Sequence, residues 1–256
     1  MTLNLNGIRS AGRKGFFEWL GRQHADVVCL QDLKAQRADI GSELQNPSGY
    51  LSHFHVAQRR GYSGVALYCR REPDRIHVGT GWPDIDAEGR YLRADFGSLS
   101  IISVYLPSGS AGPHRQAVKD SFLDRFRPFL TDLAADGREY LLCGDWNIAH
   151  RNIDLRNWRS NQKNSGFLPR ERAWMDWLFG EAGFVDVFRR LNGAEGQYTW
   201  WSNRGQARAK NVGWRIDYHV STPAFAACAR SAHIYREQWF SDHAPLSIVY
   251  DWELGT

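Results

Sequence analysis

Short apolar runs that end in polar residues recur along the chain and indicate buried strands. The clearest run covers residues 140–143 (YLLC) and stops at a glycine followed by Asp145 and Asn147. Residues 27–30 (VVCL) show the same pattern before Asp32. Similar segments predict further strands at residues 2–6, 62–68, 76–78, 91–96, 99–106 and 246–250 and around Asp217. Several predicted strands therefore end at residues that can carry chemistry.

Apolar residues at helical spacing predict three helices, at residues 13–24, 113–135 and 169–181. Pro169 fits the first turn of the third helix, whereas Pro128 is expected to kink the second. The sequence shows no repeat, low-complexity segment or linker. We therefore predict one α/β domain over residues 1–256, with a site built by loops at strand ends.

Composition and charge narrow the class of protein. The 256 residues are 43% hydrophobic, and the net charge of +4 permits an anionic partner without requiring one. No apolar run approaches the length of a membrane span. The four cysteines are far apart and form no CxxC pair, which predicts reduced thiols. We expect a monomeric, cytoplasmic protein from a bacterium, with no membrane partner.

Asp145 and Asn147 form the first candidate site. Two residues apart at a strand end, they would offer a carboxylate and an amide to one centre, such as a hard cation or a phosphate. An Asx turn that closes the strand explains the same residues equally well. On this stretch alone the two interpretations are balanced.

A second stretch favours the functional interpretation. Asp242 and His243 lie side by side before the last predicted strand, and Asp217 lies inside an apolar run, where a bare charge is costly unless it is paired. Histidine is the obvious partner. A buried aspartate can hold one imidazole nitrogen and leave the other facing a substrate.

Seven motifs carry a family resemblance over nearly the whole chain. Together they resemble the exonuclease III family of abasic-site (AP) endonucleases, within the endonuclease/exonuclease/phosphatase superfamily. In chain order the motifs are residues 4–9 (NLNGIR), 30–34 (LQDLK), 61–66 (GYSGVA), 105–109 (YLPSG), 144–150 (GDWNIAH), 213–218 (GWRIDY) and 241–246 (SDHAPL).

The resemblance implies a DNase I-like, four-layer α/β sandwich, with two packed β-sheets flanked by helices, and a metal-dependent phosphodiesterase. Mg²⁺ is the expected cofactor and Mn²⁺ a substitute, because carboxylate and amide oxygens suit hard cations. Asn6 and Asp32 match metal-site positions, with Asn4 beside them. The remaining residues expected within reach of the metal are Asp145, Asn147, Asp242 and His243.

The resemblance also implies catalytic roles. Tyr105 matches a tyrosine near the scissile phosphate. Asp145 matches the residue that orients or deprotonates the attacking water, and Asn147 the residue that holds the phosphate in the transition state. Asp217 and His243 match a carboxylate–imidazole pair, in which His243 can donate to a phosphate oxygen.

The implied substrate is double-stranded DNA with abasic sites or blocked 3′ ends. Trp200, Trp214 and Ile216 match the walls of a pocket for a flipped-out sugar that lacks its base, because a pocket too tight for a base selects the lesion that costs least to extrude. We expect Trp201 to lie in the core instead. The implied reaction is cleavage 5′ to the abasic site to leave a 3′-OH, with 3′-phosphodiesterase or phosphatase and 3′→5′ exonuclease activity.

Three further residues match DNA contacts. Arg204 lies in a loop that matches a segment entering the DNA groove, and Asn161 and Asn164 match asparagines that contact the backbone. The sequence departs from the family at Asp32, where glutamate is usual. Because aspartate is one methylene shorter, we expect weaker metal binding. The first strand also looks short for the family.

Two alternatives remain. The site could act on another phosphodiester or phosphomonoester, as in DNase I-like and lipid phosphatase relatives, although the three DNA-contact residues argue against this. The chain also resembles the catabolite repression control protein, a non-catalytic nucleic-acid-binding regulator, at residues 30–32 and 250–252. A binding module has no need of the full catalytic set, which here comprises Asp145, Asn147, Asp217, Asp242 and His243. We therefore favour the enzyme.

Overall fold

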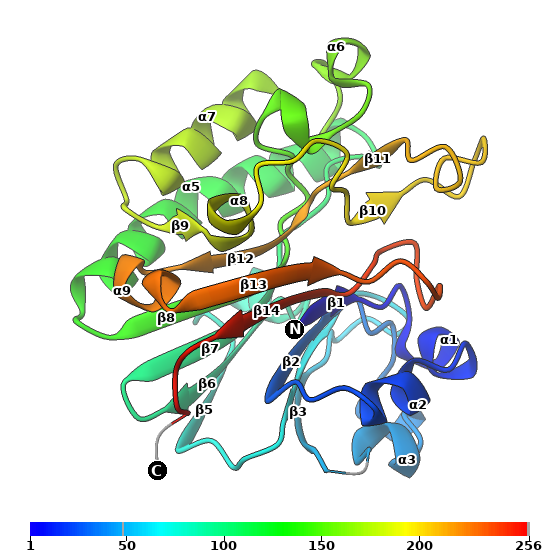
Figure 1. Ribbon diagram of the computed structural model, residues 1–256, viewed down its shortest axis with the longest axis vertical. Coiled ribbons are helices and arrows are strands. Elements are labelled where there is room, and N and C mark those ends of the chain that lie inside the picture. The colour runs from blue at the N-terminus through cyan, green and yellow to red at the C-terminus, as the bar shows by residue number, and fades with distance from the viewer. Residues whose placement is uncertain (48, 255–256) are drawn as a thin grey trace.

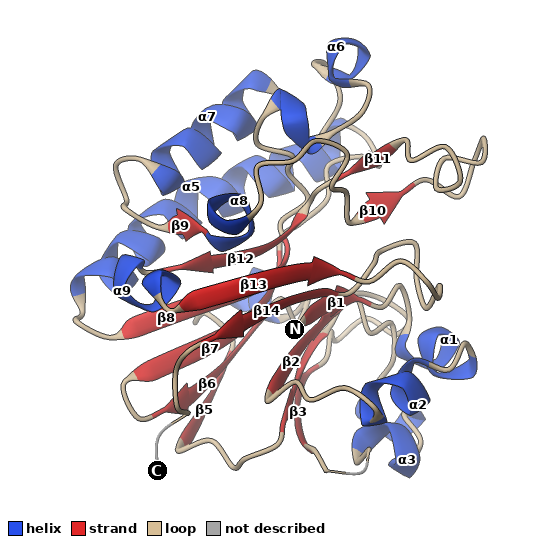
Figure 2. Cartoon of the chain, in the orientation of Figure 1, coloured by secondary structure: helices blue, strands red, loops and turns tan. Residues whose placement is uncertain are grey.

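Two six-stranded β-sheets form the centre of the protein (Figures 1 and 2). The computed structural model describes residues 1–47 and 49–254. The first sheet has the order β13 (Ala229–Ile234), β14 (Leu246–Tyr250), β1 (Thr2–Asn4), β2 (Val27–Gln31), β4 (Val65–Cys69) and β3 (Leu51–His55). The second has the order β5 (Arg75–Val78), β6 (Tyr91–Phe96), β7 (Leu99–Tyr105), β8 (Glu139–Asp145), β12 (Asp217–Ser221) and β9 (Val185–Asp186).

Helices cover the outer faces of the two sheets (Figure 2). The first sheet is covered by α1 (Ile8–Arg13), α2 (Phe16–Gly21) and α3 (Ser42–Gln45), and the second by α5 (Pro113–Ala135) and α7 (Pro169–Phe179). Shorter helices are α4 (Pro83–Asp86), α6 (Trp158–Asn161), α8 (Val187–Leu191) and α9 (Pro223–Ala227), with 3₁₀ turns at Arg37–Asp39 and Asn152–Asp154. A two-stranded ribbon, β10 (Trp200–Trp201) and β11 (Gly213–Trp214), projects from one end (Figure 1).

The alternation of side chains along the strands builds the layers. In β2, Val28 and Leu30 point to the helices that cover the first sheet, whereas Val27 and Cys29 point to the second sheet. Residues of β7 and β8 alternate in the same way between the inter-sheet core and the core beneath α5 and α7. Because each sheet is apolar on both faces, the predicted four-layer α/β sandwich is confirmed.

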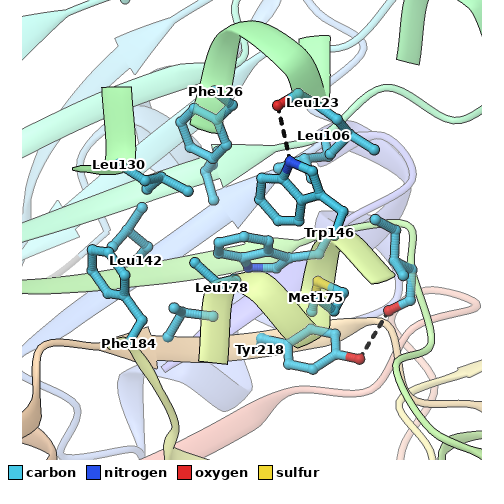
Figure 3. Packing of buried hydrophobic residues seen from close by; sticks show 14 of the residues in the cluster. Leu106, Leu123, Phe126, Leu130, Leu142, Trp146, Met175, Leu178, Phe184 and Tyr218 are labelled. Atoms are coloured by element: carbon cyan, nitrogen blue, oxygen red, sulfur yellow. Dashed lines mark hydrogen bonds between the residues drawn. The ribbon is translucent and has the colours of Figure 1, made fainter. Parts of the chain in front are cut away.

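The core beneath α5 and α7 anchors the loop that follows β8 (Figure 3). Trp146 is fully buried there, between Phe126, Trp174 and Tyr218. The Tyr218 hydroxyl donates to the carbonyl of Ile148 over 2.9 Å. The residue next to Asp145 is therefore fixed by packing, which limits the freedom of the aspartate itself.

Most predicted elements are confirmed, and the differences have local causes. Residues 113–135 form one helix with these limits, and it continues through Pro128. The predicted helix at 13–24 is confirmed only over α2, because Gly15 adopts φ 85° and separates α1 from α2. The predicted strand at 62–68 begins only at Val65, because Ser63 and Gly64 both have positive φ. Strands β3 and β13 and helices α8 and α9 were not predicted.

Two other expectations can be compared with the structure. The four cysteines carry free thiols, and Cys29, Cys69 and Cys143 are buried. No helix in the described part of the chain is long and apolar enough to cross a membrane.

Candidate active site

Strand ends from both sheets meet at one edge of the sandwich, around a cavity of about 600 Å³. Tyr105 pairs with Asp145 across β7 and β8, and Asp145 pairs with Asp217 across β8 and β12, so the three residues form one row. Of the predicted site residues, the cavity is lined by Asn6, Asp32, Tyr105, Asp145, Asn147, Asn164, Trp200, Trp214, Ile216, Asp242 and His243. The predicted residues outside its lining are Asn161, Arg204 and Asp217.

The Asx turn at Asp145 and Asn147 is confirmed, and it leaves both side chains on the cavity lining. The backbone N–H of Asn147, which has φ 53°, donates to Asp145 Oδ1 over 2.8 Å, and this is the Asx turn. Asn4 Nδ2 donates to the other oxygen, Asp145 Oδ2, over 2.9 Å across the two sheets. The same turn thus closes β8 and holds a nearly buried carboxylate on the cavity wall.

Gly144 allows this close packing. A Cβ at this position would lie 1.8 Å from the carbonyl oxygen of Val104 in the neighbouring strand β7. Any side chain would push β8 away from β7 and move Asp145, so the glycine before the aspartate has a structural reason.

Asp217 and His243 form the predicted carboxylate–imidazole pair. Asp217 Oδ2 lies 2.9 Å from His243 Nδ1, and His243 Nε2 lies 3.8 Å from Asp145 Oδ2. All three residues are buried. Asp217 Oδ1 has no hydrogen-bond partner within the described residues. Asp217 therefore contacts the side of the imidazole that faces away from the cavity, and His243 presents Nε2 toward Asp145.

The local charges shift both pKa values upward. Burial raises the pKa of Asp145, and the nearby Asp217 carboxylate raises it further, while His243 and hydrogen bonds partly oppose the shift. Burial alone would lower the pKa of His243, but the carboxylates of Asp217, Asp145 and Asp242 outweigh it and raise the pKa. The three carboxylates therefore favour the imidazolium form of His243.

A second polar cluster gathers Asn6, Asp32 and Asp242 around a cation. Lys34 Nζ lies 3.1 Å from Asp32 Oδ2 and also contacts Asn6 Oδ1. Asn6 Nδ2 donates to Asp242 Oδ1 over 2.9 Å, and Trp200 Nε1 donates to Asp242 Oδ2 over 3.1 Å. The backbone is locally strained at Asn6, Asp32 and Lys34, because all three have positive φ.

The donor atoms of this cluster fit a hard divalent cation. Two oxygens, from Asn6 and Asp32, already converge on one positive charge, the Lys34 ammonium, and Asp242 is the next residue of the same network. The cluster of Asp145, Asp217 and His243 also brings three possible ligand atoms within 4.8 Å of one another. A metal ion would have to displace a proton from His243, whose imidazolium form the surrounding carboxylates favour, so we favour the cluster of Asn6 and Asp32.

Three apolar side chains form one side of the cavity. Trp200 and Trp214, paired across β10 and β11, meet edge to face with ring centroids 6.4 Å apart. Ile216 is only 7% exposed and lies beside them in the lining. Trp201 points away from the cavity and is buried, as predicted.

The predicted DNA-contact residues lie further out. Arg204 is exposed in the loop between β10 and β11. Asn161, at the end of α6, is partly exposed and Asn164 is exposed, and Asn164 Nδ2 donates to Asn161 Oδ1 over 2.8 Å. Asn164 thus lies at the cavity, whereas Asn161 and Arg204 lie outside its lining.

Arg90 is a buried contributor that the sequence analysis missed. Its Nη1 donates to the carbonyl of Tyr105 over 2.9 Å, and its guanidinium lies 4.7 Å from the centre of the Tyr105 ring. Burial, together with Asp32 and Asp145, raises the pKa of Tyr105 well above its ordinary value. Tyr105 therefore faces the cavity as a neutral phenol that can donate a proton in a hydrogen bond.

A fully buried ion pair behind Asn147 was also missed. Lys119 contacts Glu171 over 2.6 Å and donates to the carbonyl of Asn147 over 2.8 Å. Glu171 also accepts the backbone N–H groups of Gly166 and Leu168. Lys119 shares the buried face of α5 with Phe122 and Phe126, and a charge on an apolar face was the available signal.

Comparison with known proteins agrees with the motifs and the fold. The sequence profile of the Endonuclease/Exonuclease/phosphatase family matches residues 1–243. The chain belongs to this family. An exodeoxyribonuclease of Bacillus subtilis (strain 168) is 36% identical over 97% of this chain and 98% of its own length. A DNA-(apurinic or apyrimidinic site) endonuclease of Dictyostelium discoideum is also 36% identical, over 98% of this chain and 70% of its own length.

A solved structure extends the agreement to three dimensions. The AP endonuclease from Archaeoglobus fulgidus matches this family member with a TM-score of 0.87, at 27% identity and over 98% of both chains. The resemblance to exonuclease III-type AP endonucleases is thus confirmed.

Proposed function

We propose that this protein is a metal-dependent DNA repair phosphodiesterase that cleaves the DNA backbone 5′ to abasic sites and leaves a 3′-OH. One observation carries the proposal. The buried row of Asp145, His243 and Asp217 lies against a cavity that Trp200 and Trp214 close on one side. Such a row can move protons at a phosphodiester, while the aromatic wall can receive a sugar without a base.

Asp145 is the proposed base for the attacking water. Its raised pKa brings its proton affinity closer to neutral pH, which favours general base catalysis. The hydrogen bonds from Asn4 Nδ2 and the Asn147 N–H fix both carboxylate oxygens in place. A base held in one geometry needs little reorganisation when the water attacks.

His243, Tyr105 and Asn147 are the proposed partners of the phosphate. Asp217 fixes the Nδ1–H side of His243, so the Nε2–H can donate to a phosphate oxygen and balance developing charge. The neutral Tyr105 hydroxyl can donate as well. Asn147 Nδ2 donates to Leu106 over 2.9 Å and to Asp145 over 3.3 Å, and the longer contact is the one that a phosphate oxygen would replace.

Asn6 and Asp32 are the proposed ligands of a Mg²⁺ ion, for which Mn²⁺ can substitute. Bound there, the ion would neutralise charge on the phosphoryl and leaving oxygens. Asp242 holds Asn6 through Nδ2, which keeps the amide oxygen of Asn6 turned toward Asp32 and Lys34. With the ion bound, Lys34 would either neutralise Asp32 together with the ion or move away from the carboxylate.

The proposed substrate is double-stranded DNA. Trp200, Trp214 and Ile216 offer an apolar wall that suits a bare deoxyribose, while Arg204, Asn161 and Asn164 can reach backbone phosphates. The same site can act at a blocked 3′ end, where the group 3′ to the phosphate is small. We therefore include 3′-phosphodiesterase or phosphatase and 3′→5′ exonuclease activity.

One observation favours a second candidate function. Lys34 already neutralises Asp32, and the short aspartate leaves little reach beyond the lysine. A chain with such a weakened cation site could bind nucleic acid as a regulator, with little or no catalysis. The complete row of Asp145, His243 and Asp217 makes this the second choice.

The deciding experiment uses a labelled duplex that carries one abasic-site analogue. Incision is measured with Mg²⁺, with Mn²⁺ and with EDTA, for the wild-type protein and for Asp145→Asn. An undamaged duplex of the same sequence and a duplex with a 3′-phosphate test selectivity. We expect metal-dependent cleavage 5′ to the analogue that is lost in Asp145→Asn.

Folded wild-type protein that leaves the abasic duplex intact in both metals would overturn the nuclease proposal. If the same protein still bound DNA, the regulatory function would take its place. Equal cleavage of undamaged and abasic duplex would retain the nuclease and remove the lesion specificity.

A further inference from the structure

The β10–β11 ribbon carries a second aromatic site on the face opposite the catalytic cavity. Trp200 lines the cavity, and Trp201, the next residue in the strand, points to the other side. There the guanidinium of Arg208 lies 4.9 Å from the Trp201 ring centre and 4.3 Å from that of Trp239. Trp239 comes from the loop between β13 and β14, which runs beside the ribbon (Figure 1).

Trp239 is unusual because of its exposure. It leaves 54% of its surface in solvent, although it is among the largest apolar side chains of the protein. Its contact with Arg208 holds the indole against the ribbon instead of leaving it free to rotate. An exposed indole held in place offers a flat surface on which another ring can stack.

The charge around Trp239 is positive overall, with two arginines and one acid, Glu237. Arg208 is flanked by Arg236, and no salt bridge joins either of them to an acid in the described parts of the chain. Burial, with Arg236 next, lowers the pKa of Arg208 to about 10. Arg208 Nη1 is buried and has no partner among the residues described, and Glu237 is the acid that acts on Arg236. Two neighbouring guanidinium groups repel each other unless an anion lies between them.

The patch of Arg208, Arg236 and Trp239 is adjacent to the active site along the chain and in space. Trp239 precedes Asp242 by three residues, and the backbone of Trp201 donates to the carbonyl of Asp242 over 3.1 Å. The ribbon thus has the cavity on one face and the patch on the other, and a DNA strand that crosses β10 would reach both.

We propose that Arg208, Arg236 and Trp239 form a binding site for an unpaired DNA strand, with a phosphate between the two guanidinium groups and a base stacked on Trp239. The choice of DNA as the ligand rests on the proposed nuclease function, but the site itself lies outside the row of Asp145, His243 and Asp217. Stacking on an indole accepts any base, and paired guanidinium groups accept any backbone phosphate. The site would retain the flanking strand during incision or 3′-end digestion.

Binding of a labelled oligothymidylate, measured by fluorescence anisotropy in EDTA, tests the site without cleavage. We expect Trp239→Ala to raise the Kd about tenfold, from the loss of one stacked base, and Trp239→Phe to restore most of the affinity. Arg208→Gln should raise the Kd and reduce the slope of log affinity against log salt by about 0.7. Val78→Ala, an equally exposed apolar residue on β5, is the matched control and should change nothing.

The turnover number on an abasic duplex separates this site from the catalytic one. Trp239→Ala should leave it unchanged, because the patch does not touch the scissile phosphate. An unchanged Kd in Trp239→Ala, or equal weakening in the Ala and Phe variants, would overturn the stacking site. Failure of the wild-type protein to cleave would overturn the nuclease function alone, and the oligothymidylate affinities would still decide the patch.

Discussion

Two buried aspartates, Asp145 and Asp154, occupy opposite electrostatic environments at similar depth. Both are almost inaccessible, with 2% and 1% exposure. Burial and Asp217 raise the pKa of Asp145, whereas Asp154, which burial also disfavours, has a pKa lowered to about 2 by Arg215 and Arg189. Depth alone therefore does not decide the state of a buried carboxylate.

The partners of the two carboxylates explain the difference. Asp154 Oδ1 accepts Arg215 Nε and Arg189 Nη2, both over 2.8 Å, and its Oδ2 accepts the backbone N–H of Arg151. Asp145 receives neutral amide donors, and the nearest positive charge, His243, lies closer to Asp217. One site is electrostatically satisfied and stabilises the fold, and the other retains affinity for a proton that catalysis can use.

The largest expected effect is the loss of activity when Asp145, the proposed base, is changed. Asp145→Asn should reduce kcat/KM on an abasic duplex about a hundredfold to ten-thousandfold, because the base for the water is lost. Its thermal midpoint should not fall, since the change removes a poorly compensated buried charge. Asp251→Asn, a surface carboxylate paired with Arg230, is the control. Activity within tenfold of wild type would refute the assigned role.

The counterpart change at Asp154 should damage stability. Asp154→Asn leaves Arg215 and Arg189 with an uncharged partner in the interior, and we expect a loss of about 3 to 5 kcal/mol in the free energy of unfolding in urea. At temperatures where the variant is folded, its kcat should stay near that of the wild type. A stable Asp154→Asn protein with impaired kcat would reverse the contrast between the two regions.

The pH dependence of stability gives a smaller, signed effect. The folded pKa of Asp154, about 2, lies below the ordinary value of 3.8, so its contribution is complete above about pH 4 and is lost as the pH falls toward 2. The amount is about 2 kcal/mol. In urea titrations, the difference in unfolding free energy between wild type and Asp154→Asn should shrink by this amount over the window. A constant difference from pH 5 to pH 2 would contradict the lowered pKa.

The smallest effect concerns Asp32, whose environment is intermediate between those of Asp145 and Asp154. Burial raises its pKa and Lys34 partly lowers it. In Asp32→Glu, the longer side chain should reach past Lys34. We expect the Mg²⁺ concentration for half-maximal incision to fall by about threefold. Asp39→Glu, in a nearby surface turn, is the matched control. An unchanged Mg²⁺ requirement would show that the shorter carboxylate does not limit metal binding.

Local pattern was enough to predict much of the fold. Regular apolar spacing predicted the limits of α5, and apolar runs predicted β7 and β8 within two residues. The pairing of Asp217 with His243 was also anticipated, because a lone carboxylate in an apolar strand needs a partner. The break at Gly15 was missed, since the helical spacing continues on both sides of it.

The sequence by itself determined the longer elements, the family and the residues that could carry the chemistry, because propensities and motifs are short-range properties. Only the tertiary structure decided which charges surround those residues and which contacts hold them in place. Arg90 contacts Tyr105 across 15 positions and Lys119 contacts Glu171 across 52, and neither contact has a local signature. Whether a carboxylate is reactive like Asp145 or satisfied like Asp154 depends on such distant partners, since burial strengthens whichever charges the fold brings together.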